Sequence, residues 1–183
     1  RYLLGTTTIR LRLGGKQAVL FAYADSDWAG EGGSPKDQCR STSGACVFLG
    51  TGCIWWLSKL QRVTALSSTE AEFVASSDAV FGPHPSVTRA DLLERQSAYA
   101  KSLSRCQAAC GILGIRTMLS ELGLPQHEPT FLFTDSAGSH AAIKNPINTR
   151  FRHVAMRHHR VRQACNNGNV RIHRMGTKSM LAD

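Results

Sequence analysis

The stretch Gln17-Ala-Val-Leu-Phe-Ala-Tyr-Ala24, which is followed at once by Asp25, decides the fold class. A nearly continuous apolar run of this length is typical of a strand that is buried on both faces of a sheet. A second short apolar run, Thr130–Thr134, ends in the same way, at Asp135. Helix-compatible segments separate these two runs, so we expect a sheet with helices packed against it.

The rest of the chain supplies the other elements of such a sheet. Gly44–Leu49 and Cys53–Ser58 are apolar runs joined by a Gly-Thr-Gly turn, which predicts a β-hairpin. The periodicity predicts helices over 112–122, 137–144 and 152–165, a strand over 170–175 and a helix that begins at Thr177. This order predicts an α/β fold of the mixed α+β kind.

A further helix is predicted to begin between residues 67 and 70. The spacing of a capping box is satisfied twice, by Ser67 with Glu70 and by Thr69 with Glu72. The sequence Gly82-Pro-His-Pro85 should end this helix, because proline cannot continue it.

Residues 81–107 separate this helix from the one predicted over 112–122. We expect them to be an insertion, itself helix-compatible over 88–107, that loops out and leaves the core intact. A translated non-coding stretch is the open alternative. Gly111 and Gly114 are predicted to lie inside the second helix, where each would cost up to about 1 kcal/mol relative to alanine.

Length and composition limit the class of protein. A chain of 183 residues with 42% hydrophobic residues suits one globular domain and is too apolar to be a disordered tail. We find neither an apolar run long enough to span a membrane nor a signal-peptide pattern. The six cysteines form no regular framework, which favours reduced thiols in an intracellular protein, cytoplasmic or nuclear rather than secreted.

The net charge of +9 is concentrated at one end of the chain. From Ser136 to Asp183 there are nine Lys or Arg residues against one acid, a net charge of +8, whereas residues 1–135 carry +1. A one-sided basic region favours a polyanionic partner, and nucleic acid is the usual one. A solvated basic face without a ligand is the open alternative.

The acids at the strand ends suggest a metal site. Asp25 and Asp135 each follow a buried strand, and the carboxyl ends of strands are where open α/β sheets place their sites. Carboxylates that converge repel one another and persist as anions when a cation lies between them. Hard oxygen ligands select Mg²⁺ or Mn²⁺ rather than zinc.

Four blocks of sequence carry a specific resemblance. They follow one another in the order seen in the ribonuclease H domain of copia-type LTR retrotransposon polyproteins, and the resemblance covers the whole chain except about residues 81–107. The blocks are Tyr23-Ala-Asp-Ser-Asp-Trp-Ala-Gly30, Arg40-Ser-Thr-Ser-Gly44, Leu66-Ser-Ser-Thr-Glu-Ala-Glu-Phe73 and Met180-Leu-Ala-Asp183.

The resemblance also suggests domain boundaries. Arg1-Tyr-Leu-Leu-Gly-Thr6 looks like the end of a reverse transcriptase region, so residues 1–16 would be a linker. Residues 17–183 would form the ribonuclease H-like domain, with its last helix cut short at 183.

The resemblance implies a five-stranded mixed sheet flanked by helices and an endonuclease that hydrolyses the RNA strand of RNA–DNA hybrids with two Mg²⁺ ions, which Mn²⁺ can replace. Carried over by motif, the metal ligands and catalytic residues are Asp25, Glu72, Asp135 and Asp183. Asp25 would bridge the two ions, Glu72 and Asp135 would bind one of them and Asp183 the other. The implied partners are the hybrid and the reverse transcriptase and integrase regions of the same polyprotein.

The basic end of the chain should hold the hybrid through its phosphates, without sequence preference. An alternative for each arginine is an ordinary place on a helix surface. The candidate residues are Arg150, Arg152, Arg157, Arg160 and Arg162.

Two other functions compete with this one. Integrases and transposases share the fold but use a late glutamate, and no glutamate follows Glu128, so the sequence excludes them. A catalytically inactive relic, which keeps the fold and at most binds nucleic acid, is the remaining alternative.

Overall fold

The computed structural model of the chain describes residues 18–29, 39–82, 111–145 and 156–182, and only the backbone of 156–159. Within them lies a five-stranded sheet in the order β3-β2-β1-β4-β5. β1 pairs antiparallel with β2, as β2 does with β3, and β4 pairs parallel with both β1 and β5. The strands are β1 Leu20–Asp27, β2 Thr42–Leu49, β3 Gly52–Leu60, β4 Thr130–Thr134 and β5 Val170–Arg174.

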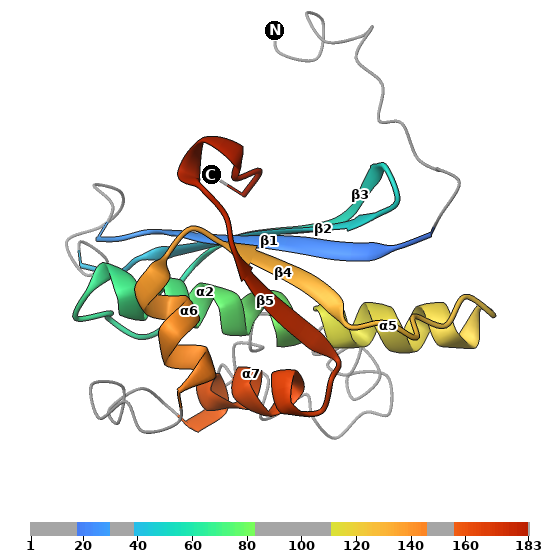
Figure 1. Cartoon of the computed structure of the whole chain (residues 1–183). Coiled ribbons are helices and arrows are strands. Elements are labelled where there is room, and N and C mark those ends of the chain that lie inside the picture. The colour runs from blue at the N-terminus through green and yellow to red at the C-terminus, as the bar shows by residue number, and fades with distance from the viewer. Residues whose placement is uncertain (1–17, 30–38, 83–110, 146–155, 183) are drawn as a thin grey trace, which may run out of the picture.

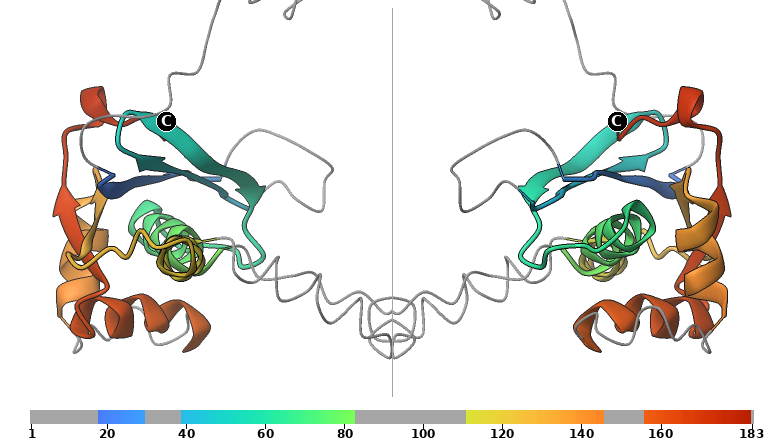
Figure 2. Two further views of the ribbon diagram at one scale, coloured as in Figure 1. Left: turned by 90° about the vertical axis from the view of Figure 1, so that its right-hand side faces the viewer. Right: turned by 90° about the vertical axis from the view of Figure 1, so that its left-hand side faces the viewer.

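The described α-helices all lie on one face of this sheet, and none of them lies on the other (Figures 1 and 2). A short 3₁₀ turn, η2 (Thr177–Ser179), lies on the side without helices, where the sequence predicts the first turn of a last helix. The helices are α2 Ser68–Phe81, α5 Ile112–Glu121, α6 Ala137–Lys144 and α7 Met156–Asn166. The mixed sheet flanked by helices that the sequence predicts is confirmed.

The side chains of β1 alternate between the two faces. Leu20, Ala22 and Ala24 belong to the main core under the helices, and both alanines are fully buried. Phe21 and Tyr23 point to the opposite face, which we call the helix-free face. The small alanines allow α2 to pack closely on the middle of the sheet, and the aromatic rings cover the side that no described helix protects.

One predicted boundary of β1 differs from the structure. The sequence suggests that the strand stops before Asp25, but β1 continues to Asp27. The reason is the partner strand, because Asp25, Ser26 and Asp27 pair in register with residues 44, 43 and 42 of β2. Asp25 therefore lies within a hydrogen-bonded ladder, which fixes its backbone more firmly than a loop would.

α2 begins as the first of the two possible capping boxes predicts. The Ser67 hydroxyl accepts a hydrogen bond from the Glu70 amide at 3.3 Å, and the Glu70 carboxylate accepts one from the Leu66 amide at 2.9 Å. Glu70 is thereby used at the helix start, as a capping residue. Glu72, two residues later, is left out of the cap and lies on the side of α2 that faces the end of β1.

α2 and α5 follow one another along nearly the same line, as the two directions of view show (Figures 1 and 2). Gly111 is the N-cap of α5 with an extended backbone, so the prediction that it lies inside a helix is wrong. A Cβ atom on Gly111 would lie 2.3 Å from the Gly82 nitrogen and 2.6 Å from the Val80 oxygen. The end of α2 and the start of α5 therefore touch. Most of the predicted 81–107 insertion lies outside the described residues.

Two features bear on the class of protein. None of the described helices is long and apolar enough to cross a membrane. Four cysteines, Cys39, Cys46, Cys53 and Cys165, are free thiols in the described part of the chain.

Candidate active site

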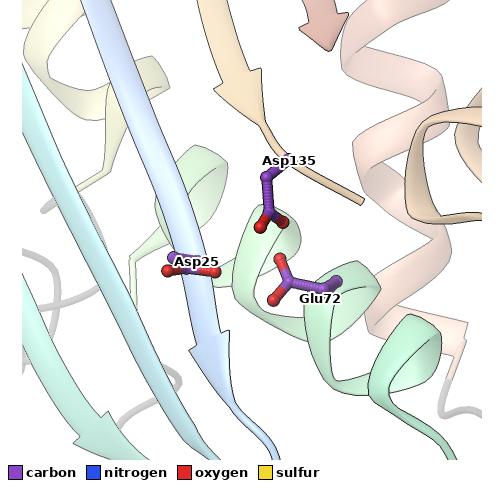
Figure 3. A group of neighbouring side chains, drawn as sticks. All are labelled: Asp25, Glu72 and Asp135. Carbon is purple, nitrogen blue, oxygen red and sulfur yellow. The ribbon is translucent and has the colours of Figure 1, made fainter. Parts of the chain in front are cut away.

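The parallel register of β1 and β4 brings the two strand-end acids together. Tyr23 lies opposite Phe133, and Asp25 and Asp135 are each two residues further on. Oxygen atoms of Asp25, Asp135 and Glu72 lie within 4.8 Å of one another, and the three carboxylates face a common point (Figure 3). The predicted convergence of the acids is thus found in the structure for three of the four residues.

Ser26 holds the carboxylate of Glu72 in place. Its amide and its hydroxyl both donate to Glu72 Oε1, at 2.8 and 2.7 Å, and the amide also donates to Asp25 Oδ1 at 2.9 Å. Ser26 is not among the site residues predicted from the sequence. Its position directly after Asp25 is the only sequence feature that points to this role. It connects the sheet to α2 at the point where their acids meet.

Burial disfavours ionisation of the Glu72 carboxyl group. Its side chain is 6% exposed, and its pKa is raised from 4.5 to about 8, mainly because burial penalises the charged form. The hydrogen bonds from Ser26 oppose this rise, and the nearby Asp25 carboxylate adds to it. A cation between the carboxylates would remove the penalty.

The second oxygen of Glu72 provides a test of whether a metal fits. Oε2 is buried and has no hydrogen-bond partner among the described residues. A buried carboxylate oxygen in this state costs free energy unless something neutralises it. The donor set consists of hard carboxylate oxygens, so the three residues suit Mg²⁺ or Mn²⁺ and not a soft metal.

Asp135 is supported by residues that come after β5. The Thr177 hydroxyl donates to Asp135 Oδ2 at 3.0 Å, and Arg174 Nε donates to the Asp135 carbonyl oxygen at 3.4 Å. Neither residue was singled out from the sequence, because they are about 40 residues away and reach Asp135 only once the chain has turned back over β4. Arg174 also brings a positive charge beside the acids.

Comparison with known proteins finds relatives of this chain among retrotransposon polyproteins. No family model matches the chain. The "Retrovirus-related Pol polyprotein from transposon RE1" of Arabidopsis thaliana is 31% identical over 185 residues, which cover 100% of this chain and 10% of the polyprotein. The counterpart from transposon TNT 1-94 of Nicotiana tabacum is 29% identical over 184 residues, which cover 100% of this chain and 11% of the polyprotein. The chain is thus homologous to a segment of copia-type retrotransposon Pol polyproteins.

The chain spans about a tenth of the length of the polyproteins that it matches. "Secreted RxLR effector protein 161" of Plasmopara viticola is 48% identical over 82 residues, which cover 43% of this chain and 54% of that protein. Among solved structures, LC11-RNase H1 isolated from compost has a TM-score of 0.48 at 9% identity and covers 88% of this chain and 86% of its own. The strand order given above establishes the fold of this chain.

The fourth predicted ligand, Asp183, lies outside the described residues, but Ala182 lines the same groove as Asp25. A neighbouring acid, Asp27, is exposed at the end of β1 and is not part of the group of three carboxylates.

The arginines predicted to hold the hybrid are only partly described. Arg150 and Arg152 and the side chain of Arg157 lie outside the described residues. Arg160 is exposed, with its guanidinium 4.6 Å from the centre of the Phe81 ring. Arg162 donates from Nε to the Ala142 carbonyl at 2.9 Å and is directed into the helix layer. Phosphate contacts from these residues stay a prediction.

Proposed function

We propose that this chain hydrolyses the RNA strand of RNA–DNA hybrids with divalent cations bound by Asp25, Glu72 and Asp135. The observation that carries the proposal is the approach of these three carboxylates to within 4.8 Å, with one buried Glu72 oxygen that no described group satisfies. Three acids at one place in a partly buried site are compatible with folding when a cation offsets their repulsion.

The neighbouring residues would orient the acids and receive the substrate. Two Mg²⁺ or Mn²⁺ ions, when bound, would supply an activated water and stabilise the leaving oxygen. Ser26 would keep Glu72 turned towards the site, and Thr177 would do the same for Asp135. The acids therefore need little rearrangement before they act.

The groove beside Asp25 suits a ribonucleotide strand. It carries hydroxyl groups of Ser26, Thr42 and Ser58 and the ring of Trp28, which is 51% exposed. Hydroxyl groups are suited to recognise a ribose 2′-hydroxyl, and an exposed ring can stack on a base. The basic C-terminal third of the chain would add phosphate contacts, and the reverse transcriptase and integrase regions of the polyprotein would be its partners inside the cell.

The test is cleavage of a hybrid whose RNA strand is labelled, in Mg²⁺ and in Mn²⁺. Loss of an outer partner of a metal ligand costs about 10–100-fold in metal affinity or activity. Replacement of a ligand itself should cost more, so Asp25→Asn should reduce cleavage by at least about 100-fold. Glu121→Gln is the control, because it removes an exposed carboxylate at the end of α5, outside the carboxylate group and the groove.

Two results would contradict the proposal. Full cleavage by Asp25→Asn would mean that the three acids are not the site. No metal-dependent cleavage by the unaltered chain, with its fold verified by circular dichroism, would favour the alternative of an inactive copy that at most binds nucleic acid.

A further inference from the structure

Gln61 directly follows β3, and its side chain is buried, with 2% exposed. Its Nε2 donates to the Ala71 carbonyl oxygen at 2.9 Å and to the Ser43 hydroxyl at 3.1 Å. Ala71 belongs to α2 and directly precedes Glu72, whereas Ser43 belongs to β2. One amide group thus joins the sheet to the part of α2 that carries the buried acid of the site.

The neighbours of this amide fix its orientation. A backbone carbonyl can only accept, so the NH₂ group of Gln61 and not its oxygen must face Ala71. The Ser43 hydroxyl donates its proton to Asp78 Oδ2 at 2.9 Å and accepts from Gln61 with its oxygen. Ala71 and Asp78 are seven residues apart, about two turns of α2. The network therefore holds one side of the helix against β2 at two points.

These bonds and the strand pairing close a ring around the Glu72 carboxylate. Ser43 pairs in register with Ser26 of β1, and Ser26 donates twice to Glu72 Oε1. From Ser43 the ring continues through Gln61 to Ala71, the residue next to Glu72. Ser26 holds the end of the Glu72 side chain, and Gln61 holds the backbone beside its start. The acid is fixed at both ends.

A buried glutamine is not what packing alone favours at this place. Its Oε1 is buried and has no hydrogen-bond partner among the described residues. A buried polar atom in that state costs free energy, whereas an apolar side chain of similar size would fill the space without this penalty. The two directional bonds of Nε2 are what the glutamine supplies in return.

We propose that Gln61 is a positioning residue for Glu72, acting through the Ala71 carbonyl group. This role rests on the function proposed above and deepens it, because it names a residue outside the site on which a metal ligand depends. Groups of such a site must be held within about 0.5 Å of their working positions. Without Gln61, the start of α2 loses a directional contact to β2, and Glu72 can shift relative to Asp25.

The test variant is Gln61→Met, which keeps the length of the side chain and removes both donated hydrogen bonds. The matched control is Gln126→Met, the same replacement at another glutamine with two side-chain bonds. Gln126 Oε1 accepts from the Leu20 amide at 3.1 Å, and its Nε2 donates to the Leu124 carbonyl oxygen at 3.2 Å. Leu20 begins β1, so these bonds lie at the end of the strand opposite the acids.

The first measurement needs neither metal nor substrate. The Ser26 amide donates to Glu72 Oε1 at 2.8 Å, so its hydrogen exchange, followed by nuclear magnetic resonance, reports whether Glu72 stays in place. At a temperature at which both variants are folded by circular dichroism, this amide should exchange faster in Gln61→Met and at the unaltered rate in Gln126→Met. An unaltered rate in Gln61→Met, or equal acceleration in both variants, would overturn the inference.

The second measurement connects Gln61 to the metal ligand. Mg²⁺ affinity by calorimetry and kcat should each fall about 10-fold in Gln61→Met, the lower end of the range for direct partners of metal ligands, because Gln61 acts through the backbone. KM for the hybrid should stay nearly the same. Because the effect passes through Glu72, Gln61→Met should cause no further loss in a chain that already carries Glu72→Gln.

The outcomes separate the two proposals. A rise in KM alone, or a full additional loss in the Glu72→Gln background, would show that Gln61 acts independently of Glu72 and would overturn the inference. If the unaltered chain does not cleave the hybrid, the exchange of the Ser26 amide still decides the role of Gln61, while the proposed activity fails by itself.

A smaller change keeps the test valid if Gln61→Met does not fold. Ser43→Ala then replaces it in each measurement, because it breaks the same ring by removing one hydroxyl group. Its matched control is Ser76→Ala, since the Ser76 hydroxyl is buried in α2 and has no hydrogen-bond partner among the described residues. Ser43→Ala should accelerate exchange of the Ser26 amide and Ser76→Ala should not. Equal rates in the two variants would contradict the ring.

Discussion

The two faces of the sheet carry different kinds of side chain. Under the helices, the central strands carry small aliphatic residues, and Ala22, Ala24 and Val47 are fully buried there. On the helix-free face, aromatic rings contact one another across strands. Phe21 and Phe48 stack with their ring centres 5.2 Å apart, and Tyr23 lies at the same distance from Phe133.

This difference explains how the site is assembled. The covered face supplies Glu72 from α2, which packs against β1, β2 and the other three described helices. On the other face, Asp135 accepts a hydrogen bond from Thr177, which belongs to the short segment that follows β5. Glu72 is thus fixed by the packed helix layer, whereas Asp135 is supported by a few contacts. The two sides of the site should therefore differ in local stability.

The two faces should differ most in the free energy of unfolding that is lost when one large ring is removed from each. Phe73 of α2 is fully buried, so Phe73→Ala should lower the free energy of unfolding by about 3–5 kcal/mol. Phe48 is half-buried, so Phe48→Ala should cost only about 1–2 kcal/mol, its share of buried area and ring stacking. Urea denaturation followed by circular dichroism measures both. Equal losses would mean that the helix-free face stabilises the fold as much as the helix layer does.

A second effect concerns pH and tests the burial of Glu72 against the helix-covered face. The pKa of Glu72 is raised to about 8 in the folded chain, so the folded state binds more protons than the unfolded state between about pH 4.5 and 8. Without metal, stability should therefore fall as the pH rises through this range and level off above it. The loss for each pH unit should be at most about 3–5 °C in Tm.

The measurement is Tm from pH 5 to 9 in the presence of a chelator. Glu72→Gln should flatten the dependence, because the amide carries no proton that can be lost. Glu121→Gln, at the exposed end of α5, should leave it as in the unaltered chain. Mg²⁺ should raise Tm most at high pH, where Glu72 ionises readily. A pH profile that is the same with and without Glu72 would mean that this carboxyl is solvated in the folded chain.

The sequence predicted the strands and most helices because their signals are local. The bounds of β4 and α6 match the predictions, and Ser67 caps α2 as its spacing indicates. The motif positions also identified the three acids that meet. Ser26 and Thr177 were missed because a serine or threonine becomes a site residue only through what folding places beside it. The close approach of the Ala182 carbonyl oxygen to Gly44 could not be predicted either, since it depends on how the chain returns over the sheet after β5.

The smallest expected effect concerns the continuity of the helix layer. Gly82 and Gly111 already touch, and α5 continues the line of α2, so removing residues 83–110 needs only a local adjustment to join them. A shorter connection lowers the cost of loop closure, by about 0.6 kcal/mol for each halving of its length, so folding should not be weakened.

We expect Tm of the shortened chain to equal or slightly exceed that of the full one. Removing residues 83–113 is the control and should destabilise it, because Ile112 is fully buried in the core under the helices. If the 83–110 deletion unfolds the chain as the control does, the segment between α2 and α5 contributes to the covered face. The helix layer would then need those residues in order to form, and they could not be regarded as an insertion.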